Sequence, residues 1–422
     1  MRKAAVLFFL TAACLVTDSR RGHSEENVEV HGFILGHFAH LVPALEPCHA
    51  TSSDFLVSEG RIRLDVIAWW DSIEAEVQIR GDLVADFVTN SFDVDLREAY
   101  FDYAAGDFDF RIGRQVATWG VGDVLFINDV FPKDWVSFFT GRPMEYLKLG
   151  VDGLRTRYSS RPVNAELIVL TNFTPDDIPT APRFCVYDPF AEVARRDGQL
   201  PASTFENAEL ALRLYRRVGN FDVSAYFYRG FWRTPSFSPD SLPSTASLTT
   251  FYPRLSVYGV SAQGSALSGV LSLETGYYDS RDDHNGNDPS IANSQWCFLV
   301  GYQKQLWKDA NVGIQYYGEV MEDYSNYRTT LPRPLPRQAE YRNVVTLRLE
   351  QLLHHQQWRL SIFAFIGLTD EDYLIRPLVT HRLSDNLLLA LGANLFGGEN
   401  DSTFLGQLDR NDNVYLSVRF DF

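Results

Sequence analysis

The sequence predicts an all-β protein: a transmembrane, antiparallel, up-and-down β-barrel of about 18 strands, with 16 as the alternative count and no separate plug domain. Three observations predict this fold. Apolar and polar side chains alternate over stretches of 12 or more residues, which is longer than the strands of most soluble sandwiches. Short and long connections alternate between these stretches, as they do when tight turns and long loops lie on opposite sides of a membrane. The chain also begins with a secretory leader.

Residues 1–22 are predicted to be a signal peptide, with the barrel following over residues 27–422. Arg2 and Lys3 form a short positive region, and the apolar stretch after them is too short to span a bilayer comfortably. The cleavage site stays open, and so does lipidation at Cys14, which follows a sequence similar to a lipoprotein signal.

The alternation is clearest over residues 56–70, where Ile62 and Leu64 share one face and Arg61 and Arg63 share the other. An Arg or Lys that faces lipid at the midplane costs about 2–4 kcal/mol, so the charged face is assigned to a water-filled interior. The predicted strands, in order, are 28–41, 55–70, 73–88, 94–103, 108–119, 152–159, 163–172, 206–216, 220–232, 253–263, 269–279, 294–306, 310–321, 341–353, 357–368, 373–383, 386–396 and 412–422.

Every second connection between these strands is short, for example 104–107 and 217–219, and the intervening ones are usually long. This order predicts that the long connections, such as 173–205 and 233–252, are extracellular. Tryptophans support the topology, because most lie at or next to predicted strand ends, where aromatic girdles form at the two membrane surfaces. These are Trp69, Trp70, Trp119, Trp232, Trp296, Trp307 and Trp358.

The last strand carries the most specific local signal. Residues 414–422 alternate strictly and end on Phe422. This pattern resembles the terminal-strand signature that the outer-membrane assembly machinery reads. Tyr415, Phe420 and Phe422 are its candidate residues here.

A motif that begins in the last part of the fifth predicted strand and continues into the following loop consists of Gly113, Arg114, Gln115, Trp119, Gly120, Asn128, Asp129, Pro132 and Asp134. It resembles a motif of large, mostly uncharacterised Gram-negative outer-membrane porin-like proteins and covers about 25 of the 422 residues. The resemblance implies an outer-membrane barrel that passes small solutes, but it implies no particular substrate. Strict alternation points Arg114 at lipid, so we expect either a bulge at Gly113 or a position at the rim.

Composition excludes several classes of protein. The net charge of −16 argues against nucleic-acid binding. Neither a catalytic motif nor a metal-binding cysteine pattern occurs, so we predict no enzyme activity, no cofactor and no metal. Cys48 and Cys185 both fall in predicted loops, where they form either a disulfide or free thiols.

The charged interior face supplies candidate wall residues of the pore. They are Arg61, Arg63, Arg80, Arg111, Arg155, Arg157, Glu74, Glu76 and Glu98, with Glu274 and Arg348 on the same face of later strands. Two interpretations stay open: these residues create a field across a water-filled channel, or they form ion pairs that brace the barrel.

Residues 120–151 are the candidate constriction, because their many aromatic side chains would be buried if the segment folded into the barrel. An external cap over the mouth is the alternative. The candidate residues are Asp123, Asp129, Lys133, Asp134, Arg142, Glu145 and Lys148, and we expect charges in this loop to brace no strand.

These patterns predict a porin-like channel in the outer membrane of a Gram-negative bacterium that lets small hydrophilic solutes or ions diffuse. The alternatives are a dedicated exporter or transport-complex barrel, for polysaccharide or another substrate, and a sheath for an electron-transfer partner. The expected partners are outer-membrane lipid, the outer-membrane assembly machinery and small solutes or ions. A homo-oligomer stays open, and nucleic acid is not expected.

Overall fold

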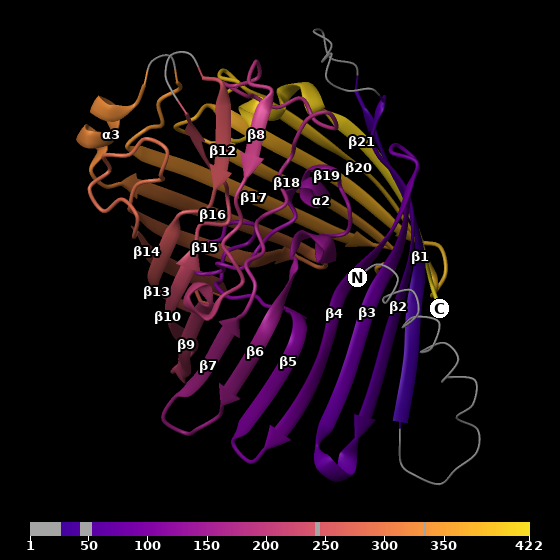
Figure 1. The fold of residues 1–422 in the computed structure, drawn as a ribbon. Helices are drawn as coiled ribbons and strands as arrows, with labels where there is room; N and C mark the ends of the chain where they lie inside the picture. The colour runs from indigo at the N-terminus through magenta and orange to yellow at the C-terminus, as the bar shows by residue number, and fades with distance from the viewer. Residues whose placement is uncertain (1–26, 43–52, 241–244, 333–334) are drawn as a thin grey trace.

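The computed structural model describes residues 27–42, 53–240, 245–332 and 335–422 (Figure 1). Within these residues, 18 strands form one antiparallel sheet, and three short strands form a second sheet. Each strand of the large sheet pairs with its neighbours along the chain, and the last one, β21, pairs with β1, so the sheet closes into a barrel. The predicted antiparallel up-and-down barrel and the count of 18 strands are confirmed.

The barrel strands are β1 (Asn27–Leu41), β2 (Phe55–Trp70), β3 (Ala75–Asp86), β4 (Ser91–Ala105), β5 (Phe108–Val116), β6 (Gly150–Tyr158), β7 (Asn164–Leu170), β9 (Glu209–Val218), β10 (Phe221–Phe231), β13 (Arg254–Ala266), β14 (Gly269–Ser280), β15 (Gln295–Trp307), β16 (Ala310–Met321), β17 (Tyr341–Leu353), β18 (Trp358–Gly367), β19 (Asp372–Arg382), β20 (Leu387–Gly398) and β21 (Asn413–Asp421). The helices are α2 (Trp135–Phe139) and α3 (Tyr324–Thr330), with short 3₁₀ turns η1 (Asp71–Ile73), η2 (Met144–Leu147), η3 (Phe205–Asn207) and η4 (Gly406–Asn411).

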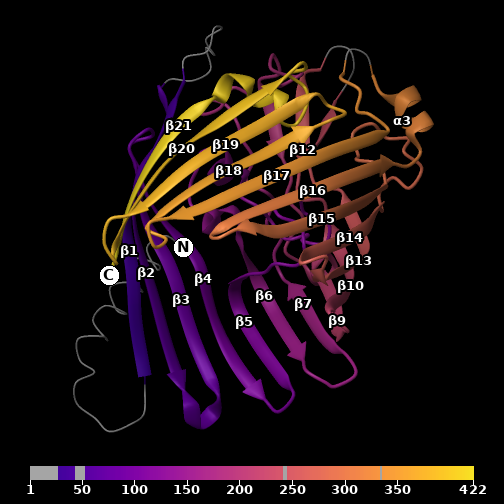
Figure 2. The ribbon, with the colours of Figure 1, turned by 180° about the vertical axis from the view of Figure 1, so that it is seen from behind.

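The second sheet joins two of the long connections. It consists of β8 (Arg195–Gly198), β11 (Ser236–Pro239) and β12 (Ser247–Phe251), with β12 parallel to β8 and antiparallel to β11. Residues of the connection after β7 and of the connection after β10 therefore fold together at the end of the barrel that carries the long loops (Figure 1). Figure 2 shows the opposite side, where β13 to β21 run side by side.

Several predicted strand ends differ by three residues from the observed ones: β4 begins at Ser91 rather than at residue 94, and β13 ends at Ala266 rather than at residue 263. β5 ends at Val116 rather than at residue 119, because the chain turns into the barrel there. The strands predicted at 55–70, 310–321 and 341–353 have the same bounds as β2, β16 and β17.

A bulge at Gly113 was one of two alternatives for Arg114; Gly113 has a φ of +129° but causes no register shift, and the shift lies on the neighbouring strand. The pairing of β3 with β4 shifts after Arg80, which gives β4 one extra residue and buries both Arg97 and Glu98. The pairing of β4 with β5 runs through Gly113 without a shift, so Arg114 stays on the outer face. Its guanidinium donates to the Leu96 carbonyl oxygen at 2.6 Å and to the Asp152 carboxylate at 3.3 Å.

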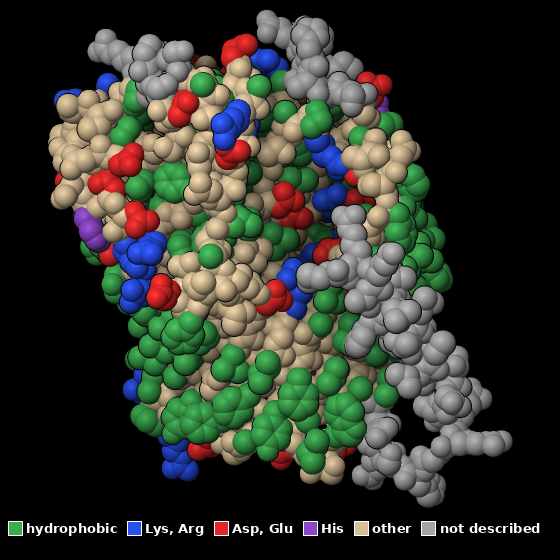
Figure 3. All heavy atoms as spheres, in the orientation of Figure 1, with side chains coloured by type: hydrophobic (Ala, Val, Ile, Leu, Met, Phe, Trp, Pro, Cys, Tyr) green, Lys and Arg blue, Asp and Glu red, His purple; other side chains and the backbone are tan. Residues whose placement is uncertain are grey.

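The outer wall of the barrel is apolar. Ile34, Ile62, Ile112 and Ile314 are 42–58 % exposed, and Figure 3 shows hydrophobic side chains covering the half of the barrel away from the long loops. A continuous exposed apolar belt of this kind is stable only in contact with lipid, so the barrel spans a membrane. Among the described residues, no helix is long and apolar enough to cross a membrane.

The aromatic girdle prediction is correct for some tryptophans and wrong for others. Trp296, Trp307 and Trp358 lie at strand ends with their side chains exposed. Trp119 is only 6 % exposed and donates to Glu166 inside the barrel. Trp232, which follows β10, packs against an interior cluster. Both lie inside because the chain leaves the wall immediately before them.

Candidate functional site

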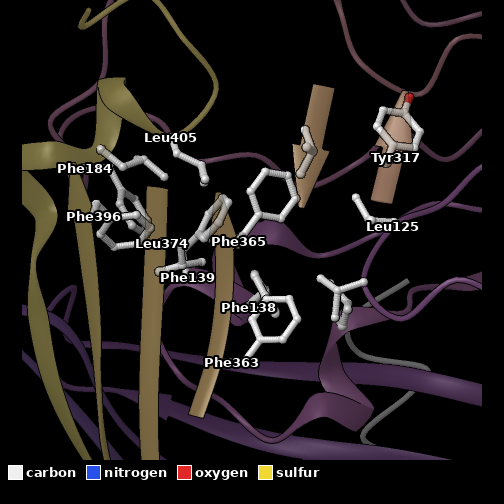
Figure 4. Packing of buried hydrophobic residues seen from close by; sticks show 14 of the residues in the cluster. Leu125, Phe138, Phe139, Phe184, Tyr317, Phe363, Phe365, Leu374, Phe396 and Leu405 are labelled. Atoms are coloured by element: carbon white, nitrogen blue, oxygen red, sulfur yellow. The ribbon is translucent and has the colours of Figure 1, made fainter. Parts of the chain in front are cut away.

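The connection between β5 and β6, residues 117–149, lies inside the barrel, and we call it the inner segment. Its helix α2 contributes Phe138 and Phe139, which are 3 % and 1 % exposed. Their rings pack against Phe363 of β18 and Phe396 of β20, with ring centroids 6.4 and 5.5 Å apart (Figure 4). These contacts bury the aromatic side chains against the wall, so the segment is not an external cap.

Polar groups hold both ends of α2. The Asp134 carboxylate accepts a hydrogen bond from the Ser137 amide at 2.6 Å, which caps the first turn. At the other end, the Phe139 carbonyl oxygen accepts from the side-chain amides of Asn394 and Asn413, at 2.9 and 3.1 Å. Terminal carbonyls have no partner within a helix, so these two wall residues fix where the helix ends. Sequence reasoning did not single out either asparagine, although Asn394 interrupts an otherwise apolar run.

Glu274 on β14 is the main receptor for the beginning of the inner segment. Its carboxylate accepts from the amides of Val121, Gly122 and Asn128 at 2.8–3.2 Å and from the Asn128 side chain at 2.9 Å. Gly120 is required here, because its φ is +77° and a Cβ would lie 2.7 Å from the carboxylate oxygen Oε1. The sequence places Glu274 in the lumen, but nothing local in the sequence indicates this role.

The charges expected to face permeating ions are partly buried. Asp129, Lys133, Arg142 and Asp134 all make structural contacts, and the first three are less than 9 % exposed. Asp129 accepts from Lys133 Nζ at 3.1 Å and from Lys148 Nζ at 2.9 Å. Burial lowers the pKa of Lys133, and the Asp129 carboxylate opposes that shift.

Arg142 joins the inner segment to β2. Its Nε and Nη2 donate to Glu59 at 2.9 and 2.7 Å, and Glu59 also accepts from Arg61 Nε at 2.7 Å. A carboxylate that is 1 % exposed thus lies between two guanidinium groups. The expectation that charges in this loop brace no strand is therefore wrong. A buried charge needs a partner, and the wall supplies one.

A second network joins the inner segment to β2, β3 and β21. Tyr146 Oη donates to Asp82 at 2.7 Å, and Asp82 also accepts from Arg63 Nε at 2.6 Å. Glu145 pairs with Arg63, and it accepts from Arg419 Nη1 at 2.8 Å. These wall residues act as ion-pair braces in the structure.

Three of the seven candidate constriction residues keep a substantial exposed surface. The side chains of Asp123, Glu145 and Lys148 are 46, 38 and 28 % exposed. Asp123 nevertheless pairs with Arg348 of β17, which donates from Nη2 at 2.9 Å. Asp123, Glu145 and Lys148 are therefore the accessible members of the candidate set. The other four are held by contacts within the segment or, for Arg142, with β2.

Most of the wall candidates also pair with carboxylates. Arg80 donates to Asp65 at 2.7 Å and to Glu98 at 2.6 Å. Arg111 and Arg157 pair with Asp102 and Glu166, at 2.6 and 2.9 Å.

Arg155 is different. It lies directly across from Arg111 in the pairing of β5 with β6, and it makes no ion pair or hydrogen bond with any described residue.

Cavities lie on both sides of the inner segment. One of about 640 Å³ lies near the short turns, with Glu74 and Glu76 among its acidic lining residues and Arg111, Arg155 and Arg157 among its basic ones. The other, of about 270 Å³, lies between the inner segment and the ends of the strands that carry the long loops. The inner segment thus narrows the barrel interior between two cavities. The cavity near the short turns is polar, and the cavity near the long loops is more aromatic.

The terminal strand closes the barrel. Backbone bonds of 2.9 and 3.0 Å join Phe422 to Gly32 of β1. Phe420 and Phe422 are exposed on the outer face, and Tyr415 is buried inside.

The cysteines complete the set of predicted sites. Cys185 is disulfide-bonded, and its predicted partner Cys48 lies outside the described residues, as does the predicted signal peptide. Cys297 is a buried free thiol. Within the described ranges, no group of three or more His, Cys, Asp or Glu residues could hold a metal ion.

No protein-family model and no curated protein matches the chain. Several solved structures share its fold. OccAB3 of Acinetobacter baumannii has a TM-score of 0.55 at 8 % identity, over 94 % of this chain and 99 % of that one. OccK3 (OpdO) of Pseudomonas aeruginosa has the same TM-score and identity, over 94 % and 96 %. OccD3 (OpdP) of the same species has a TM-score of 0.53 at 8 % identity, over 94 % and 91 %. At these identities the likeness concerns the fold alone.

Proposed function

We propose that the protein is a porin-like channel in the outer membrane of a Gram-negative bacterium, through which small hydrophilic solutes or ions diffuse. The observation that carries this proposal is a closed barrel with an apolar outer wall, a charged interior and a segment bonded across that interior. The motif from Gly113 to Asp134, at the end of β5 and in the first half of the inner segment, resembles that of porin-like proteins and supports the same function. The fold of the Occ structures supports it as well.

Charge placement suggests how such a channel would treat ions. A solute that passes the inner segment meets the partly exposed side chains of Asp123, Glu145 and Lys148. It then enters the cavity near the short turns, where acidic residues face the unpaired Arg155 and its basic neighbours. Because ions in a narrow passage lie within a Debye length of these groups, their fields act on permeation with little screening.

An exporter of a polymer and a sheath for an electron carrier would both require a wide lumen. The inner segment is bonded to β14 on one side and to β1, β2 and β3 on the other. We therefore favour a channel for small solutes over these two alternatives.

The test is conduction by the purified, heat-modifiable protein in planar bilayers. We expect stepwise conductance increases, with a reversal potential in a salt gradient that moves toward anion preference in Asp123→Asn, because Arg348 loses its partner. Glu350→Gln is the matched control, since Glu350 pairs with Arg359 and does not touch the inner segment. A folded protein that gives no conductance steps would refute the proposal.

The orientation has its own test. Single cysteines placed in 173–205 or 233–252 should react with an impermeant maleimide on intact cells. Labelling confined to the turn at 217–219 would invert the proposed topology.

A further inference from the structure

Three arginines lie on the outer face of the barrel, at the strand ends that carry long loops, and we call them the arginine cluster. They are Arg229 of β10, Arg254 of β13 and Arg281, which directly follows β14. Arg229 lies two residues after Phe227, and Arg254 lies four residues before Tyr258. The rings of Phe227 and Tyr258 are in contact on the outer face, with centroids 5.4 Å apart. Even spacings along a strand keep side chains on one face, so the arginines share the outer face with these rings.

Strand pairing brings the three arginines together. The Arg281 amide donates to the Arg254 carbonyl oxygen at 3.0 Å, which continues the pairing of β14 with β13 by one residue. Arg254 and Arg281 therefore lie directly opposite each other. Arg229 lies opposite Ser256, so it is a diagonal neighbour of Arg254 on the same face. Long side chains in both relationships reach each other, so one head group can contact all three guanidinium groups.

The three guanidinium groups make no ion pair and no hydrogen bond within the part of the chain that the structure describes. Arg114 provides the contrast. It also lies on the outer face, but it pairs with Asp152 at 3.3 Å. Like charges that lie directly opposite each other on a sheet repel, so an unpaired cluster of this kind favours a bound anion.

Two carboxylates lie near the arginine cluster, but both are engaged elsewhere. Asp279 lies 2.9 Å from Nδ1 of His284, and Asp282 accepts from the backbone amide of Arg254 at 2.7 Å. The pKa of Arg281 lies below its ordinary value, because burial and the charges of the other two arginines outweigh the effect of these carboxylates. Positive charge without a partner therefore remains at this place.

The arginine cluster lies where the apolar belt of the barrel ends. Tyr258 and Val260 of β13 are 49 and 50 % exposed on the outer face. Figure 3 shows basic side chains directly above the hydrophobic belt, on the side of the barrel where Figure 1 labels β13 and β14. The head groups of a bilayer, with their phosphates, lie immediately outside its hydrocarbon core. Guanidinium groups suit this boundary, because their paired N–H groups match two phosphate oxygens.

From this we infer that the arginine cluster binds the phosphate groups of a membrane lipid in the leaflet on the long-loop side. The acyl chains of that lipid lie against the apolar wall below the cluster. The inference names a partner of the outer wall, and no solute of the interior. It rests on the proposed outer-membrane location, because that location determines which lipids the long-loop side meets.

The experiment is native mass spectrometry of the full-length protein in detergent micelles, titrated with lipid A, which carries two phosphate groups. Saturable binding is expected. Dephosphorylated lipid A should bind at least tenfold more weakly, because about tenfold is the effect of losing one charge-assisted hydrogen bond. Inorganic pyrophosphate at equal concentration should not displace lipid A, since it has no acyl chains. Equal affinity for both forms of lipid A, or displacement by pyrophosphate, would overturn the inference.

Variants test the three side chains. Arg229→Gln, Arg254→Gln and Arg281→Gln should each weaken the binding of lipid A about tenfold. The triple variant should bind lipid A no more tightly than the wild type binds the dephosphorylated form. Arg216→Gln is the matched control, because Arg216 is an exposed arginine near the short-turn end of β9, and its affinity should equal that of the wild type. Heat-modifiable migration establishes that each variant is folded.

Lipid binding and conduction are separate measurements. Absence of saturable binding to the folded wild type, or equal affinity in the wild type and the triple variant, would overturn this inference whether or not the protein conducts. Phosphate-dependent binding of lipid A by a protein that gives no conductance steps would support this inference and overturn the channel function alone.

Discussion

Glu274 offers the sharpest test of how the inner segment is held. Its carboxylate is 4 % exposed and accepts four hydrogen bonds from the segment. Oε1 accepts both bonds from Asn128, and Oε2 accepts those from Val121 and Gly122. Glu274→Gln keeps one acceptor oxygen and turns an NH₂ group toward two donors. Glu274→Ala removes all four acceptor contacts.

The loss of attachment free energy in each variant follows from the number of hydrogen bonds that the variant removes. A hydrogen bond to a charged group contributes about 1.5–3 kcal/mol, and coupled bonds do not add fully. Taking the lower value, Glu274→Gln weakens the attachment by about 3 kcal/mol and Glu274→Ala by up to about 6 kcal/mol. The strand pairs of β14 with β13 and β15 are unaffected, so the barrel should still close.

Single-channel recording measures the consequence. A loosened inner segment should give higher mean conductance and more open-channel noise, in the order Glu274→Ala, Glu274→Gln, wild type. Limited proteolysis within residues 117–149 should follow the same order. Glu350→Ala is the control, because that carboxylate faces Arg359 and does not contact the segment. If Glu274→Ala has the conductance, noise and protease resistance of the wild type, the reasoning is refuted.

Three further predictions concern closure, packing and pH. Deleting Phe422 removes its backbone bonds to β1 and should lower the amount of heat-modifiable barrel in membrane fractions; unchanged assembly would contradict this role. Gly141→Ala should lower the melting temperature, because its Cβ would lie 2.3 Å from the Tyr415 ring. Gly219→Ala is the control, because Gly219 also has a positive φ but its Cβ would meet nothing within 4 Å. Equal decreases in melting temperature for the two variants would argue against a clash. Desolvation raises the pKa of Asp177 from 3.8 to about 6, so between these pH values the folded state holds a proton that the unfolded chain releases. The backbone of Asp177 is hydrogen-bonded to Trp135 and Lys133 of the inner segment, and this attachment should weaken as pH rises through this range. Channel noise should therefore rise between pH 4 and about 6 in the wild type and stay flat in Asp177→Asn; the same pH dependence in both would exclude Asp177 as its source.

The sequence by itself determined the barrel. A period of two residues, sustained for longer than a soluble strand, fixes which side chains face lipid and which face the interior. Strands such as β2 and β17 therefore have the predicted bounds, and Arg61 and Arg63 face inward as predicted. This information is local, because each residue's face follows from its neighbours in the same strand.

Only the tertiary structure decided what the interior charges do. Asp129 and Arg142 were expected to line an open constriction, yet both are buried by partners. Glu274 accepts from Asn128, 146 residues earlier in the chain, and no local pattern reports such a contact. The extra residue of β4 at Arg97, rather than at Gly113, likewise follows from pairing with β3. Alternation assigns a side chain to the interior, but the closed barrel decides which groups meet there, because burying a charge is tolerated only where distant strands bring it a partner.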